Sequence, residues 1–203
     1  MRINKFFTIF DMVLIAMLTA VSIAFKAALQ MLVKPAISAL GVLHAGAVLG
    51  GFYMLWLPLA ICMTGKRGGA LLLCVLQALL LLITSLPGSH GIWNLVVYIL
   101  PGVIAEAVYL YKPKAGYGIW HFIAAVMLAN FVGVFLTTGL YYRGLSSVAL
   151  SIVFLLTILS GIIGGVTGNY IMAFINKTKI LEKQKEKKPT APKYLKDYDD
   201  NEK

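Results

Sequence analysis

The sequence has few charged residues, and carboxylates are the rarest of all in its apolar part. Only 13% of its 203 residues are charged, 60% are hydrophobic, and the mean hydropathy is +0.84. A soluble domain has about 25% charged and about 45–50% apolar residues. Asp11 and Glu106 are the only carboxylates in the apolar body of the chain. This composition excludes an ordinary soluble domain and predicts an integral membrane protein.

Catalytic motifs are also missing. The sequence has no His/Glu helix motif for zinc and no G-x-S-x-G elbow, and "GSH" at 88–90 is typical of a turn. The stretch "TGKR" is no phosphate-binding loop, because Ala60 stands at the upstream glycine position and no Ser or Thr follows the lysine. We predict a protein that is not an enzyme, with no catalytic residues, no metal, no cofactor and no ATPase motif.

Cysteine is scarce as well. The two cysteines, Cys62 and Cys74, both lie in apolar segments on the side predicted to be cytoplasmic. Thiols on that side stay reduced, so no disulfide is expected.

Long apolar runs make up most of the chain. A helix that crosses a bilayer needs about 20 mostly apolar residues, and turn-forming or basic stretches, beginning with "VKPAISALG", separate the runs of about that length. We predict an all-α integral membrane domain over residues 1–176 and a charged, disordered cytoplasmic tail over 177–203. The six predicted transmembrane helices cover residues 10–33, 42–63, 69–86, 92–111, 118–141 and 147–175.

The basic residues predict the orientation of the chain in the membrane. The net charge of +10 does not indicate nucleic-acid binding, because the lysines and arginines cluster at segment ends and in the tail. Short cytoplasmic loops carry the excess of Lys and Arg in membrane proteins. One side holds Arg2, Lys5, Lys66, Arg67, Lys112, Lys114 and the tail, whereas the other holds only Lys34 and Arg143. Both termini are therefore predicted to be cytoplasmic, in a multi-pass protein of the plasma membrane.

Polar side chains inside the apolar segments are candidates for a binding site. Such groups are costly in hydrocarbon and usually face a bundle interior or a cavity. Aromatic walls with a few convergent polar groups suit a small polar molecule captured from outside. The predicted substrate-binding residues are Lys26, His44, Gln77, Trp93, Asn94, Tyr98, Glu106, Asn130, Thr137 and Tyr141.

Each of these residue types has an ordinary structural alternative. Tyr and Trp near helix ends also anchor helices at the membrane interface. Gln77 or Asn130 alone would serve as an interhelical hydrogen bond. The stem of Lys26 is long enough to extend to the outer headgroups, and Glu106 has basic residues near it at the inner surface. The sequence leaves both interpretations open for each residue.

Small residues recur at a spacing of four. This spacing places them on one helix face, where another backbone can approach closely. The first segment carries Ala16, Ala20 and Ala24, and the last carries pairs such as Gly161 and Gly165. We expect the glycines of the second and sixth segments to pack inside the bundle. The alanine row fits an external partner as well as an internal neighbour.

The alanine row resembles the A-x-x-x-A signature of the substrate-binding S components of energy-coupling factor (ECF) vitamin transporters. Over roughly residues 10–176, "GKRGGALL", "PGVIAEAVYLY" and "LSGIIGGVTG" look like the YkoE-like branch, which is linked to uptake of thiamin or its hydroxymethylpyrimidine precursor. The resemblance implies that Ala16, Ala20 and Ala24 dock on an ECF transmembrane coupling subunit that works with two ATP-binding subunits. It implies a small-molecule vitamin as ligand.

The chain departs from that branch at two positions. The branch carries carboxylates in its third helix, where this chain offers only Gln77, and a glutamine where Pro101 stands. A cationic ligand such as thiamin would therefore lack its counter-charge. The alternative function is a self-sufficient secondary transporter or channel for a small polar solute, which would normally show an internal repeat or paired broken helices. A membrane-embedded enzyme or assembly factor is a third class, which no catalytic constellation supports.

Overall fold

The computed structural model describes residues 7–39, 45–84, 93–110, 117–141 and 145–178, and within these ranges the chain is helical without strands. The described elements are α1 Ile9–Ala39, α2 Ala45–Met54, α3 Trp56–Thr64, α4 Gly69–Thr84, α5 Asn94–Leu110, α6 Ile119–Tyr141 and α7 Ser147–Lys177. The predicted tail after residue 178 lies outside the described residues.

Four stretches of helix are long and apolar enough to cross a membrane. They are Ile9–Val33, Ala45–Thr64, Ile119–Leu140 and Ser147–Lys177. Two shorter apolar helices cover Gly69–Ile83 and Leu95–Leu110. The prediction of an all-α, multi-pass membrane protein is confirmed at this level, whereas six crossings and cytoplasmic termini remain predictions.

Helix α1 is longer than predicted. The span predicted over 10–33 agrees with the apolar stretch Ile9–Val33, whereas the helix itself continues through Pro35 to Ala39. A proline inside a helix removes one hydrogen bond to the carbonyl four residues earlier and bends the helix. Near the end of a helix this loss affects only the last turn, so the expectation that "VKPAISALG" begins a break was wrong.

The second predicted helix is divided into two. Helices α2 and α3 meet at Leu55 and together form the apolar stretch Ala45–Thr64, so the segment predicted over 42–63 is confirmed in the described residues, with an interruption that was not predicted. Pro58 explains the interruption, because proline fits the first turn of a helix but not its interior. The break predicted at "TGKRGG" is confirmed. Gly65 ends α3 in the left-handed conformation (φ +64°), and its N–H donates to the Ile61 carbonyl over 2.8 Å.

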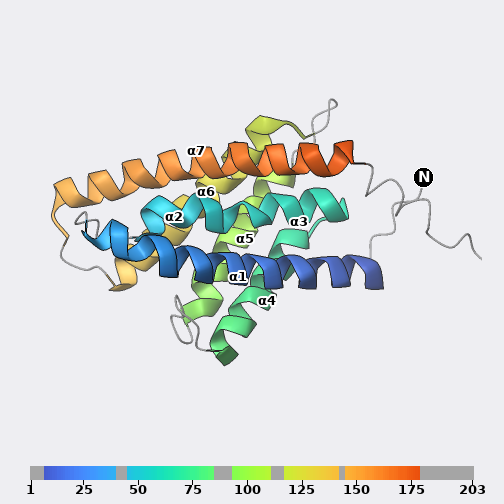
Figure 1. Ribbon diagram of the computed structural model, residues 1–203, viewed down its shortest axis with the longest axis horizontal. Helices are drawn as coiled ribbons and strands as arrows, with labels where there is room; N and C mark the ends of the chain where they lie inside the picture. Colours follow the sequence, from blue (N-terminus) through green and yellow to red (C-terminus); the bar gives the residue numbers. More distant parts are fainter. Residues whose placement is uncertain (1–6, 40–44, 85–92, 111–116, 142–144, 179–203) are drawn as a thin grey trace, which may run out of the picture.

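The helix axes follow two main directions. In Figure 1, α1, the α2–α3 pair and α7 run along the long axis of the molecule, and α5 lies at a steep angle to them. Helix α1 runs opposite to α2–α3 and α7, so the start of α1 and the end of α7 lie at the same end of the molecule. This arrangement brings α1 alongside the α2–α3 pair, so side chains of these helices can meet.

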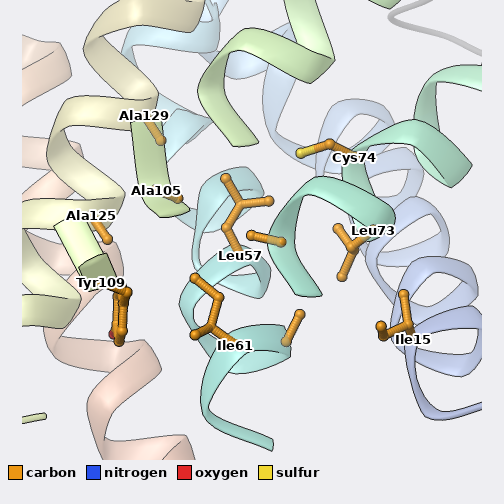
Figure 2. Packing of buried hydrophobic residues seen from close by; sticks show 11 residues of the cluster. Ile15, Leu57, Ile61, Leu73, Cys74, Ala105, Tyr109, Ala125 and Ala129 are labelled. Atoms are coloured by element: carbon orange, nitrogen blue, oxygen red, sulfur yellow. The ribbon is translucent and has the colours of Figure 1, made fainter. Parts of the chain in front are cut away.

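The largest buried cluster joins five helices. Figure 2 shows side chains of α1, α3, α4, α5 and α6 meeting around Leu57 and Ile61. Leu73 and Ala105 are fully buried there, and Tyr109 is 3% exposed. Lipid tails are as apolar as these side chains, so close van der Waals packing rather than escape from water stabilises such a cluster in a membrane.

Glycines bring α7 close to α2 and α6. A Cβ atom at Gly161 would lie 2.6 Å from Met127 Cα, and one at Gly165 would lie 2.5 Å from Ile123 Cα, both on α6. The Ser160 hydroxyl accepts the Gly51 N–H over 2.9 Å and donates to the Val48 carbonyl over 2.6 Å. Internal packing of these glycines, as predicted, therefore holds α2, α6 and α7 together.

Candidate functional site

Helix α1 buries a polar stripe. Asp11, Thr19 and Ser22 are 6%, 0% and 2% exposed, and their spacing places them with Ile15 on one helix face. The Thr19 hydroxyl donates to the Ile15 carbonyl over 2.8 Å, and the Ser22 hydroxyl donates to the Thr19 carbonyl over 2.7 Å. These bonds to the helix's own backbone make buried hydroxyls tolerable. Lys26 follows Ser22 one turn later on the same face.

The alanine row lies on a different face of α1. Ala16, Ala20 and Ala24 are all exposed. Large apolar side chains beside the row, such as Met17 at 63% and Val21 at 52%, are exposed as well. Within the described part of the chain the row therefore does not pack internally.

Two tyrosine rings hold the Lys26 ammonium. Nζ lies 4.4 Å from the ring centroid of Tyr98 on α5 and 5.4 Å from that of Tyr53 on α2. A cation within about 6 Å of a ring centroid is attracted by the negative face of the ring. Lys26 is half-buried, and its head group points to the interior aromatic side chains rather than away from them.

Two more side chains with polar groups lie on neighbouring turns of these helices. Gln30, one turn after Lys26, has its side chain beside the Tyr53 hydroxyl. Trp56 packs edge-on against Phe25, with ring centroids 5.8 Å apart. We name Lys26, Gln30, Tyr53 and Tyr98, together with Trp56 three residues after Tyr53, the Lys26 cluster.

Several polar atoms of the cluster lack a hydrogen bond. Tyr98 is 7% exposed, and neither its hydroxyl nor the Trp56 Nε1–H has a partner among the described residues. A buried polar group without a partner costs about 1–3 kcal/mol, so an unsatisfied group in a native bundle is a sign of a site that receives a ligand or water.

Carboxylates lie elsewhere in the bundle. Asp11 forms an ion pair with Lys66, in which both side chains are about one-tenth exposed. Asp11 also accepts the Thr8 N–H over 2.8 Å and the Thr8 hydroxyl over 2.6 Å, which caps the start of α1. Lys66 belongs to the turn between α3 and α4, so the pair fixes the start of α1 to that turn.

Glu106 accepts a hydrogen bond from the N-terminal turn of α4. Its Oε1 accepts the Ala70 N–H over 2.8 Å, where a helix N-terminus offers unsatisfied donors and a partial positive charge. Glu106 lies two helical turns after Tyr98 on α5, about 12 Å along the axis. Lys26 therefore has neither described carboxylate beside it.

Gln77 and Asn130 each form an interhelical hydrogen bond. Gln77 Nε2 donates to the Ser22 hydroxyl on α1 over 2.5 Å, one turn before Lys26. Asn130 is 1% exposed, and its Nδ2 donates to the Thr157 carbonyl on α7 over 3.0 Å. Gln77 thus borders the Lys26 cluster, whereas Asn130 joins α6 to α7.

The other predicted site residues lie outside the cluster or outside the described side chains. The Thr137 hydroxyl donates to the Gly133 carbonyl of its own helix over 2.9 Å. Trp93 is 50% exposed. His44 and the side chains of Asn94 and Tyr141 lie outside the described residues.

Three residues of the cluster were not predicted. Helical spacing in the sequence could have identified Gln30, Tyr53 and Trp56 as candidates. Gln30 stands four residues after Lys26, and Trp56 stands three residues after Tyr53, so each pair shares a helix face. The contact between these two faces depends on the way α1 packs against α2–α3, and the sequence pattern does not specify that packing.

Within the described residues no group of three or more His, Cys, Asp or Glu side chains is placed to hold a metal ion. The described part of the chain instead concentrates aromatic, amide and ammonium groups in the Lys26 cluster. These groups suit an organic molecule.

The comparison with protein families finds one match. The model of the family described as "ABC-type cobalt transport system, permease component" matches residues 10–135, which is more than half of the chain. The sequence finds no match among curated proteins or solved structures. The matched range includes α1 to α5 and most of α6, and with them every residue of the Lys26 cluster. The chain belongs to the family of ABC-type cobalt transport system permease components.

Proposed function

We propose that this protein is the substrate-binding S component of an ECF-type importer. The family match supports a membrane component of such a transporter. The assignment as an S component rests on α1, because two faces of this helix differ in composition and burial. One face buries the polar stripe that leads to Lys26, and another exposes Ala16, Ala20 and Ala24. A single helix would thereby join a ligand site to a docking surface.

The proposed cycle uses both faces of α1. The protein binds a small water-soluble vitamin or precursor from outside, docks through the alanine row on an ECF transmembrane coupling subunit, and releases the ligand inside. Small side chains let the partner's backbone approach closely, which strengthens van der Waals contact between membrane helices. Two ATP-binding subunits supply the energy, because the sequence carries no ATPase motif. Cytoplasmic termini and six crossings belong to this proposal.

The substrate is proposed from the chemistry of the Lys26 cluster. A cobalt ion, as in the family's name, prefers imidazole, thiolate or carboxylate ligands, whereas the cluster offers phenol, indole, amide and ammonium groups. An organic solute therefore fits the cluster better. Hydroxymethylpyrimidine and thiamin are the compounds that the sequence resemblance suggests, but the Lys26 charge disfavours thiamin, which is a cation, and finds no counter-charge in hydroxymethylpyrimidine, which is neutral.

Co-purification tests the proposal directly. A tagged chain expressed with an ECF coupling subunit and its two ATP-binding subunits should retain all three in detergent. Ala20→Trp should abolish this retention through steric bulk on the docking face, while the isolated variant keeps its melting temperature. The matched control is Ile163→Trp, at an exposed position of α7, which should retain the complex.

Two results would contradict the proposal. Transport that continues when the coupling module is deleted would indicate a self-sufficient transporter instead. Retention of the complex by Ala20→Trp at the wild-type level would remove the alanine row from the docking surface.

A further inference from the structure

We propose that the Lys26 cluster binds the anionic group of a small organic acid, with Lys26 as the residue that selects for negative charge. The inference rests on the proposed transport function and specifies its substrate class. It narrows the solute from vitamins in general to compounds with a carboxylate or a similar oxyanion.

The charge balance around Lys26 is the first support. Between residues 1 and 181 the sequence contains only two carboxylates, Asp11 and Glu106. Asp11 forms an ion pair with Lys66, and Glu106 accepts a hydrogen bond from Ala70 at the start of α4. A charged lysine within a membrane usually pairs with an opposite charge. Since the two carboxylates already have partners elsewhere, an anionic ligand is the natural counter-charge.

The position of the ammonium is the second support. A lysine that extends to the headgroups would carry its head group away from the interior. The Lys26 Nζ instead lies over the ring of Tyr98, which is 7% exposed, and near the ring of Tyr53. Ring faces stabilise a positive charge but accept no strong hydrogen bond, so these two ring contacts leave the ammonium N–H donors available to oxygen atoms.

The balance of donors and acceptors is the third support. The ammonium of Lys26 is a donor only. The Tyr53 and Tyr98 hydroxyls can donate, and they have no partner among the described residues, as is also true of Gln30 Oε1, which is an acceptor. Charge-assisted hydrogen bonds from such donors to a carboxylate are about twice as strong as neutral ones. A set in which donors predominate around a positive charge is complementary to an acceptor-rich anion and repels a cation.

A series of three probes of nearly equal shape tests the inference. Benzoate, benzamide and benzamidine carry a negative, a zero and a positive charge near neutral pH. Equilibrium dialysis of radiolabelled benzoate against the full chain in lipid nanodiscs measures binding, with the two other compounds as competitors at millimolar concentration. Benzoate should bind, benzamide should compete weakly, and benzamidine should not compete.

Variants then assign the selectivity to Lys26. Lys26→Met keeps the apolar stem and should weaken benzoate binding about ten- to one-hundred-fold, as expected for the loss of a charge-assisted hydrogen bond. Lys26→Arg should retain much of the binding. Lys177→Met removes a lysine at the end of α7, away from the cluster, and should bind like the wild type. Helical circular dichroism at the wild-type level shows that each variant is folded.

The outcomes separate this inference from the proposed function. Absence of benzoate binding, stronger binding of benzamidine, or unchanged binding in Lys26→Met would each overturn the anion site. The co-purification experiment does not depend on these probes. Retention of the coupling subunits together with failure of benzoate would leave the S-component proposal intact, whereas the converse would leave an anion site in a protein with another means of transport.

Discussion

Helices α1 and α7 are both 31 residues long and both carry small residues at a spacing of four, yet they use this pattern in opposite ways. Helix α7 buries Gly161, Gly164, Gly165 and Gly168 against α2 and α6. Helix α1 exposes its three alanines and buries hydroxyl groups instead.

The difference follows from what each helix must bury. In α7 the missing Cβ atoms let backbones meet, and apolar side chains such as Ile163 and Leu155 point outward. In α1 the costly groups are Asp11, Thr19 and Ser22, which hydrocarbon solvates poorly. These groups turn inward and leave the alanines outside. A small-residue pattern therefore predicts a smooth face, while the polarity of the other faces decides whether that face is internal.

The largest expected effect comes from adding bulk to the internal face. Gly165→Leu should prevent folding or lower the free energy of unfolding by more than about 3 kcal/mol, because a Cβ there would overlap the backbone of Ile123 and Phe122. Unfolding in mixed SDS micelles, followed by circular dichroism, measures this. Ala20→Leu adds similar bulk to the exposed row and should change the stability by less than about 0.5 kcal/mol. Equal losses in the two variants would refute the contrast between the helices.

A smaller effect is expected at the start of α1. Lys66→Met leaves the Asp11 carboxylate without its cation and should destabilise the protein by about 3 kcal/mol, as for other largely buried ion pairs. The double variant Asp11→Asn/Lys66→Met removes both charges and should recover most of this loss in the same unfolding experiment. A double variant no more stable than Lys66→Met would show that the charge pair is not what fixes α1 to the turn.

The smallest effect is expected within the polar stripe. A double-mutant cycle of Ser22→Ala and Gln77→Leu should give a coupling energy of about 0.6 kcal/mol, the average for interhelical hydrogen bonds in membranes. The four unfolding free energies of the cycle measure this coupling. A coupling near zero would show that the bond between α1 and α4 does not help to hold the stripe inward.

Much of the fold could be predicted from hydropathy. Stretches of apolar residues predict the helices because backbone groups in hydrocarbon must pair within their own segment. The errors were local. Pro35 was expected to follow the end of α1 but lies within it, and the interruption at Leu55 within the span Ala45–Thr64 was not predicted. Whether a proline bends or ends a helix depends on the contacts around it, which composition does not reveal.

The candidate site was predicted only in part. Lys26 and Tyr98 were among the predicted residues, and the structure brings them together. Tyr53 and Trp56 were missed, since aromatic side chains in an apolar run give no sign of which helix they will face. Glu106 and Asn130 form hydrogen bonds to Ala70 and Thr157, and their predicted contact with a substrate stays a prediction.

The sequence by itself determined that this chain is an apolar, helical membrane protein, because scarce charge and long apolar runs leave no other stable arrangement. It also determined that Lys26 has almost no carboxylate available in the chain before the tail. Only the tertiary structure decided which small residues pack inside and which groups surround the ammonium. Those outcomes depend on the rotation of α1 about its axis, and this rotation is set by contacts with other helices rather than by local propensity.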